Sequence, residues 1–119
     1  MAKEISILVD GNLTNGKVTN RFSPGMASID QTNARAIDFI QTVGVVEEAV
    51  TFTDFTGQGL VFLYNLDTIN FVEWGLTGSY PARLTPNDPP TVFRLNSGAT
   101  LYLKADSNPC DVRIVGYDV

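Results

Sequence analysis

The chain has 119 residues, a length typical of one domain, and 44% of them are hydrophobic, which argues against disorder. Thirteen acidic residues outnumber eight scattered basic ones, and the net charge of −5 argues against nucleic-acid binding, which needs a concentrated basic face. A single cysteine excludes a scaffold held by internal disulfides.

The N-terminal part predicts a strand, a glycine-bearing loop and a return strand. Apolar residues alternate over residues 5–9, and Asp10-Gly11 is a turn signal that would end this strand. A second turn signal, Asn15-Gly16, precedes a return strand over residues 17–22, and residues 23–25 (Ser-Pro-Gly) break the chain again. The first residues lack the apolar segment of a signal peptide, so we expect synthesis in a cytoplasm and no membrane association.

Residues 34–46 fit two kinds of secondary structure. Ile37, Phe39 and Val43 follow the two-residue period of a strand, whereas Ile37, Ile40 and Val43 follow a helical period. Because Ile, Phe, Val and Thr dominate this segment, we predict a strand.

Residues 60–75 are the most strongly patterned stretch. Two runs rich in β-branched and aromatic residues, 60–64 and 71–74, flank a short segment that carries Asn, Asp and Thr. This pattern predicts two consecutive strands joined by a turn, most simply a hairpin. The first run is apolar at five successive positions, which indicates a strand buried on both faces.

Loops punctuate the rest of the chain at short, even spacing. Residues 77–81 and 85–90 have loop compositions and leave only a short edge segment at residues 82–84. Further strands are predicted at residues 91–95, 100–104 and 112–117. Eight or nine strands without a secure helix predict an all-β fold, a single β-sandwich domain over residues 1–119. Eight strands favour a jelly-roll-like arrangement.

The residue types present predict that the chain is not an enzyme. Without histidine, and with Cys110 as the only cysteine, Ser-His-Asp and Cys-His arrangements and common zinc sites are impossible. No glycine-rich loop stands between a strand and a helix, so no nucleotide cofactor is expected. Cys110 follows Pro109 in a turn-like segment and is predicted to be a small, half-buried side chain.

Acidic residues leave two further kinds of site open. A glycosidase needs two carboxylates at a fitting separation, and the candidates are Glu47, Glu48, Asp54, Asp67 and Glu73. Loop carboxylates that suit calcium are Asp67, Asp88 and Asp106. Small β-sandwiches normally expose acids for solubility, and no Asp-x-Asp-x-Asp spacing is present, so we predict neither a catalytic nor a metal site.

Four aromatic residues suit either a ligand-binding surface or packing against protein. Trp74, Tyr80, Tyr102 and Tyr117 could form a sugar-stacking platform, as in a carbohydrate-binding module, or belong to the core or to a protomer interface. Trp74 stands in line with Val72 and beside Gly75, which favours packing.

The second half of the chain resembles a family of small virion proteins of tailed bacteriophages. The residues that carry the resemblance are Leu63-Tyr64-Asn65-Leu66-Asp67, Asn70-Phe71-Val72-Glu73-Trp74-Gly75, Val92-Phe93-Arg94-Leu95, Gly98-Ala99-Thr100-Leu101-Tyr102-Leu103-Lys104-Ala105 and the closing Tyr117-Asp118. The resemblance covers residues 60–119. Relatives often have Gly-Glu where this chain has residues 87–90 (Asn-Asp-Pro-Pro), and the shared motif contains no catalytic residue.

The resemblance implies a structural protein of the phage particle, and it favours a capsid decoration (cement) protein over a tail, neck or fibre component. Such proteins are commonly homotrimers that bind the major capsid protein on the outer surface of the head, after synthesis in the host cytoplasm. The competing interpretation is a carbohydrate-binding β-sandwich module. The candidate interface residues are Trp74, Tyr80, Arg83, Pro89, Pro90 and Tyr102.

Overall fold

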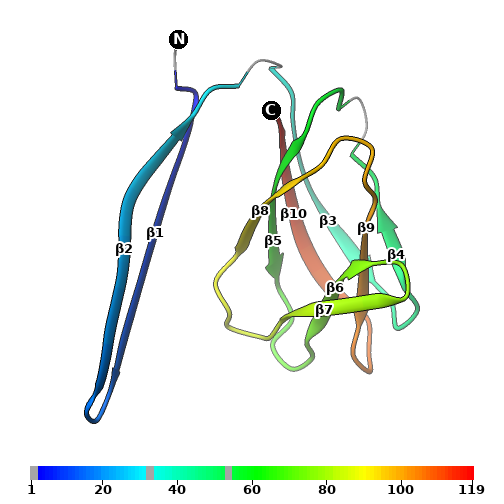
Figure 1. Ribbon diagram of the computed structural model, residues 1–119. Helices are drawn as coiled ribbons and strands as arrows, with labels where there is room; N and C mark the ends of the chain where they lie inside the picture. Colours follow the sequence, from blue (N-terminus) through cyan, green and yellow to red (C-terminus); the bar gives the residue numbers. More distant parts are fainter. Residues whose placement is uncertain (1–2, 32–33, 53–54) are drawn as a thin grey trace. The chain divides into compact units, whose positions relative to one another are not determined.

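The computed structural model describes residues 3–31, 34–52 and 55–119. Across these residues the chain forms ten antiparallel β-strands and no helix (Figure 1). The predicted all-β fold is therefore confirmed. The chain divides into two compact units, Met1–Thr32 and Asn33–Val119.

No helical segment of the described residues has the length and apolarity that a membrane crossing requires.

The first unit is a long β-hairpin, here called the arm. Strands β1 (Ile5–Asn15) and β2 (Val18–Ile29) pair from Ile5↔Ile29 to Asn15↔Val18. The two-residue loop begins with Gly16 at φ 58°, a conformation that glycine adopts without strain, so the turn predicted at Asn15-Gly16 is confirmed.

Two predicted breaks in the arm were wrong. Asp10-Gly11 and residues 23–25 do not end strands, because the ladder passes from Val9↔Gly25 to Gly11↔Phe22 and absorbs them in a β-bulge. Gly25, at φ 92°, supplies the backbone conformation that the bulge requires.

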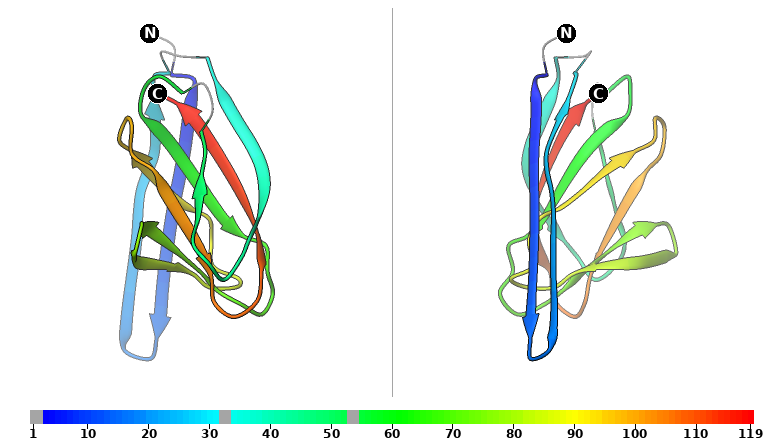
Figure 2. Two further views of the ribbon diagram at one scale, coloured as in Figure 1. Left: turned by 90° about the vertical axis from the view of Figure 1, so that its right-hand side faces the viewer. Right: turned by 60° about the vertical axis from the view of Figure 1, so that its left-hand side comes forward.

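The second unit is a β-sandwich of eight strands in two four-stranded sheets. The first sheet has the order β3-β10-β5-β8 and the second β4-β9-β6-β7 (Figures 1 and 2). The strands are β3 (Ala36–Val43), β4 (Glu48–Val50), β5 (Gly59–Asn65), β6 (Val72–Leu76), β7 (Ser79–Leu84), β8 (Thr91–Leu95), β9 (Leu101–Ala105) and β10 (Cys110–Asp118).

The sandwich covers less of the chain than the single domain predicted over residues 1–119, because the arm is a compact unit of its own. The strand predicted within residues 34–46 is confirmed as β3. Residues 82–84, predicted as a short edge segment, do belong to β7 at the edge of the second sheet, but residues 79–81, predicted as loop, belong to the same strand.

One hydrophobic core lies between the two sheets. Val61, Leu63 and Ile114 of the first sheet and Val72 and Leu103 of the second are fully buried. In β9 and β10 buried residues alternate with more exposed ones, as expected for sheets that cover a core with one face. Cys110 also belongs to this core, so it is fully buried instead of half-buried as predicted.

The hairpin predicted over residues 60–75 was wrong. Both strands exist, but β5 pairs with β10 and β8, whereas β6 pairs with β9 and β7 in the other sheet. Successive strands alternate between the sheets everywhere in the sandwich except at β6 and β7.

The connection after β5 is held by its own polar side chains. The Asn65 amide donates to the carbonyl oxygens of Asn70, at 3.0 Å, and Leu84, at 2.9 Å. The carboxylate of Asp67 accepts hydrogen bonds from the backbone amides of Ile69 and Asn70. These bonds stabilise a loop that carries the chain to the other sheet, so the Asn and Asp residues that suggested a hairpin turn have a different structural role.

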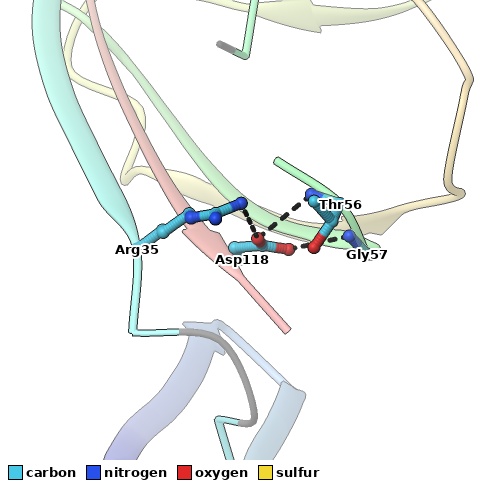
Figure 3. A network of polar contacts seen from close by, with 4 residues as sticks. All are labelled: Arg35, Thr56, Gly57 and Asp118. Carbon is cyan, nitrogen blue, oxygen red and sulfur yellow. Dashed lines mark hydrogen bonds and ion pairs between the residues drawn. The ribbon is translucent and has the colours of Figure 1, made fainter. Parts of the chain in front are cut away.

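A buried carboxylate ties the end of β10 to the segment before β5 (Figure 3). Asp118 is fully buried, and its two oxygens accept hydrogen bonds from the backbone amides of Thr56, at 3.1 Å, and Gly57, at 3.0 Å. The Arg35 guanidinium lies 3.9 Å from the same carboxylate. Amide donors and a cation together compensate for burying this charge.

Candidate protein interfaces

Four of the predicted interface residues belong to strands of the second sheet: Trp74 to β6, Tyr80 and Arg83 to β7, and Tyr102 to β9. Tyr102 and Lys104 alternate with the buried Leu101, Leu103 and Ala105, so they lie on the outer side of β9. Glu73 stands opposite both Lys104 and Arg83 in the strand register. We call the surface formed by Glu73, Arg83, Tyr102 and Lys104 the β9 face.

Aromatic and charged groups contact each other around the β9 face. The Arg83 guanidinium lies 3.6 Å from the centroid of the Phe71 ring, and the Lys104 ammonium lies 5.6 Å from that of Tyr80. Such cation–π contacts hold long side chains in place over apolar rings. Arginine and tyrosine in this arrangement are typical of protein interfaces.

Glu47 fixes the turn between β6 and β7. Its carboxylate accepts hydrogen bonds from the Thr77 hydroxyl, the Gly78 amide and the Tyr80 hydroxyl. The bonds from Thr77 and then from Tyr80 lower the pKa of Glu47, and the bond to Glu47 raises the pKa of Tyr80. With these donors engaged, Glu47 has a structural role in the turn.

Trp74 lies between the sheets, away from the β9 face. Its ring stacks on Phe93 of β8, with centroids 4.6 Å apart and planes at 13°. Because β6 and β8 belong to different sheets, this stack joins the two layers and packs against the core. The packing interpretation of Trp74 is therefore the one that the structure supports.

Pro89 and Pro90 are exposed in the connection between β7 and β8. Pro90 lines a hollow on the first sheet, described below, and Pro89 is not among the residues lining it. The six predicted interface residues therefore lie in three places. Tyr80, Arg83 and Tyr102 are on the second sheet, Trp74 packs between the sheets, and Pro89 and Pro90 are in this loop.

The outer side of the first sheet carries an apolar surface that the sequence reasoning missed. The strand register places Val115, Phe62 and Val92 in one row, with Tyr117 and Leu60 in the next row. We call the surface formed by Ile40, Phe62, Tyr64, Val92, Val115 and Tyr117 the β10 face; Leu60 points to the same side but is only 5% exposed. Ile40 is 60% exposed, and the rings of Phe62 and Tyr117 meet edge to face at 5.2 Å.

A charged pair lies within the β10 face, because Arg113 stands between Ile40 and Tyr64 in the strand register and Asp38 stands opposite Val115. The Arg113 guanidinium binds the Asp38 carboxylate through two contacts, at 3.0 and 2.6 Å, and this bond lowers the pKa of Asp38 and raises that of Arg113. A hollow of about 230 Å³ lies between Phe62, Tyr64, Pro90 and Arg113. Apolar side chains, tyrosine and arginine together are typical of protein-binding surfaces.

A signal for the β10 face was present in the sequence. An antiparallel strand that faces water on one side alternates apolar and polar residues, but residues 60–64 are apolar throughout. We interpreted this run as burial on both faces, which holds on the outer side for Leu60 at 5% exposed, whereas Phe62 is half-buried and Tyr64 is 39% exposed. The run predicts instead that the outer face is apolar and available to a partner.

The arm carries a second apolar surface. Its register places Ile5, Ile7, Val9 and Leu13 of β1 on one side, together with Val18, Phe22, Ala27 and Ile29 of β2. We call this side the arm face. Phe22 is 62% and Val18 59% exposed. The opposite side of the arm is largely polar, with an ion pair between Arg21 and Asp10 at 3.5 Å and one apolar pair, Leu8 and Met26.

Two of the carboxylates considered above for catalysis or metal binding, Asp67 and Glu48, have structural partners. Asp67 binds backbone amides of its own loop, first that of Asn70, and these bonds lower its pKa. Glu48 accepts a hydrogen bond from the Gly44 amide. Asp54 lies outside the described residues. Residues 3–31, 34–52 and 55–119 contain no group of three acidic or cysteine residues that could hold a metal ion.

Cys110 is a poor nucleophile in this setting. Burial, and then the charges of Asp67, Asp106 and Asp111, raise the pKa of its thiol. Because the thiolate is the reactive form, these surroundings suppress thiol chemistry. The same charges mark an acidic end of the sandwich around the start of β10.

A hollow of about 260 Å³ opens at another part of the sandwich. Its lining includes Phe52, Phe55, Leu95, Asn96 and Thr100, and none of the described residues that line it is ionisable. Aromatic rings beside amide and hydroxyl groups could hold a small neutral ligand.

Comparison of the chain with protein-family models, with curated proteins and with solved structures finds no match.

Proposed function

We propose that this chain is a structural component of a tailed-phage particle, and specifically a capsid decoration protein that binds the major capsid protein as a homotrimer. The observation that carries an assembly role is the amount of apolar surface outside the core. The arm face and the β10 face both present large apolar side chains to solvent, and contiguous patches of this kind mark binding surfaces.

The link to phage particles rests on the resemblance of residues 60–119. The strand order supports the same proposal, because the orders β3-β10-β5-β8 and β4-β9-β6-β7 are those expected of a jelly roll, a fold used in viral capsids. Asn65, Asp67 and Asn70 of the shared motif form the loop after β5, which explains the motif as a structural requirement.

The β9 face is the candidate contact with the capsid. Tyr102 and Arg83 offer the residue types enriched in interfaces, and Lys104 and Glu73 offer charges of both signs. A three-fold oligomer presents this face three times to a local three-fold axis, which multiplies a modest affinity. A protein that binds the assembled lattice, and not dissociated subunits, stabilises the lattice by mass action.

Heating phage heads with and without the protein tests this proposal. We expect heads that lack the protein to rupture at lower temperature, and added protein to restore the wild-type rupture temperature. The variant Arg83→Ala/Tyr102→Ala should restore it only at much higher concentration. Heads of equal stability with and without the protein would contradict a cement role.

Two other functions remain as alternatives. A tail, neck or fibre component would be present at a few copies per particle instead of hundreds. A carbohydrate-binding module would use the hollow lined by Phe52 and Phe55, and glycan binding lost on Phe52→Ala would favour it.

A further inference from the structure

We propose that the arm face packs on the β10 face of a second copy of this chain, with the arm tip at the Asp111 end of that face. The inference rests on the proposed function only in its expectation of a homo-oligomer and does not require a phage head.

The arm needs a partner because of its own composition. A two-stranded hairpin is at best marginally stable alone in water. Here Val9, Leu13, Val18 and Phe22 lie on one side, each at least 46% exposed in the single chain. A second molecule that covers this side removes apolar surface from water and stabilises the hairpin.

Charge favours the sandwich of another copy as that partner. Residues 33–119 contain ten acidic and five basic residues, whereas residues 1–32 contain three of each. Two sandwiches therefore repel each other, but the arm approaches a sandwich without net like-charge repulsion. Contact between two arms would leave the β10 face uncovered, whereas contact between an arm and a sheet covers both apolar surfaces.

The dimensions of the two surfaces agree. The strands of the arm have 11 and 12 residues, or roughly 36–40 Å at about 3.3 Å per residue. Strands β5 and β10 have 7 and 9 residues, or roughly 23–30 Å. An arm laid along the β10 face therefore covers it, and its tip reaches past the end of the sheet.

Charges at the ends of the β10 face set the direction of the arm. The tip carries Lys17, and no acidic residue occurs in residues 11–22. One end of the face ends in Asp111, with Asp67 and Asp106 in the adjacent loops. The other end carries Arg94, opposite Leu60. The tip is attracted to the acidic end and repelled from the basic one.

Sedimentation velocity of the purified full chain over a range of concentrations tests the contact. We expect an oligomer whose dissociation constant rises roughly 10- to 100-fold in Val18→Ser/Phe22→Ser, because two central apolar contacts are lost. The matched control is Leu8→Ser/Met26→Ser, which changes two equally exposed residues on the opposite side of the same hairpin and should leave the dissociation constant within about threefold.

Three further variants test the contact without changing the apolar residues of the arm. Ile40→Lys changes an exposed residue of the β10 face, leaves the arm intact and should weaken the oligomer about tenfold. Lys17→Glu should weaken it, and the double variant Lys17→Glu/Asp111→Lys should recover part of the loss. A chain that stays monomeric at every concentration, equal effects of the two arm variants, or no recovery in the double variant would overturn the inference. Arm-dependent oligomers that do not bind heads would leave it standing and contradict only the proposed function.

Discussion

Replacement of Trp74 by alanine tests how the two sheets are joined. The ring stacks on Phe93 across the sandwich with centroids 4.6 Å apart, and both rings pack against the core. A fully buried tryptophan costs about 3–5 kcal/mol on truncation. Because Trp74 is only half-buried, we expect a loss of roughly 2–4 kcal/mol in the free energy of unfolding.

Urea denaturation of the full chain measures this loss. Tyr102→Ala is the matched control, because Tyr102 lies on the outer side of the same sheet and its truncation should cost no more than about 1 kcal/mol. In a double-mutant cycle with Phe93→Leu, the stacked pair should show a coupling of about 0.5–1.5 kcal/mol. A Trp74→Ala protein as stable as the wild type, with loss of sugar binding instead, would refute the packing role.

Three other changes follow from the structure. Gly75→Ala places a methyl group 2.4 Å from the Ser79 carbonyl oxygen and should lower the free energy of unfolding by roughly 1–3 kcal/mol. Gly11→Ala is the control, because its nearest neighbour is 3.9 Å away and the free energy of unfolding should change little. Equal effects of the two substitutions in urea denaturation would contradict the close contact at Gly75. The folded-state pKa of Glu47 is lowered, so its contribution to stability is present above the ordinary value of about 4.3 and is lost as the pH falls through the folded value. Glu47→Gln should flatten this part of the stability–pH curve, and an unchanged acid limb would contradict the assignment. The buried Cys110 should react with an aromatic disulfide reagent only after unfolding in urea, and fast reaction of the native protein would contradict its burial.

Strand positions could be predicted from the sequence because they depend on local pattern. The alternation at Ile37, Phe39 and Val43 and the Asn15-Gly16 turn are readable without tertiary information. The β10 face was partly readable too, because residues 60–64 lack the polar alternation of a half-exposed strand.

Strand pairing could not be predicted in the same way, because it depends on residues far apart in the chain. The pairing of β5 with β10 places Leu63 opposite Ile114, and neither segment has a sequence feature that identifies the other as its partner. A bulge explains why the strand breaks predicted at Asp10-Gly11 and at residues 23–25 were wrong. Both segments have turn-forming sequences, but they meet at the shift in register between Val9↔Gly25 and Gly11↔Phe22 inside the hairpin. The predicted interface residues do not form one surface for the same reason. The position of Trp74 between the sheets depends on its stack with Phe93 of the other sheet, which the sequence does not reveal.

The number of copies of this chain in purified particles tests the central claim most directly. Quantitative mass spectrometry against the major capsid protein measures it, and imaging of the same particles locates the bound copies. A decoration protein should be present at hundreds of copies, in a fixed ratio to the capsid protein and spread over the head surface. A few copies confined to the tail or neck, or no copies in the particle, would contradict this account.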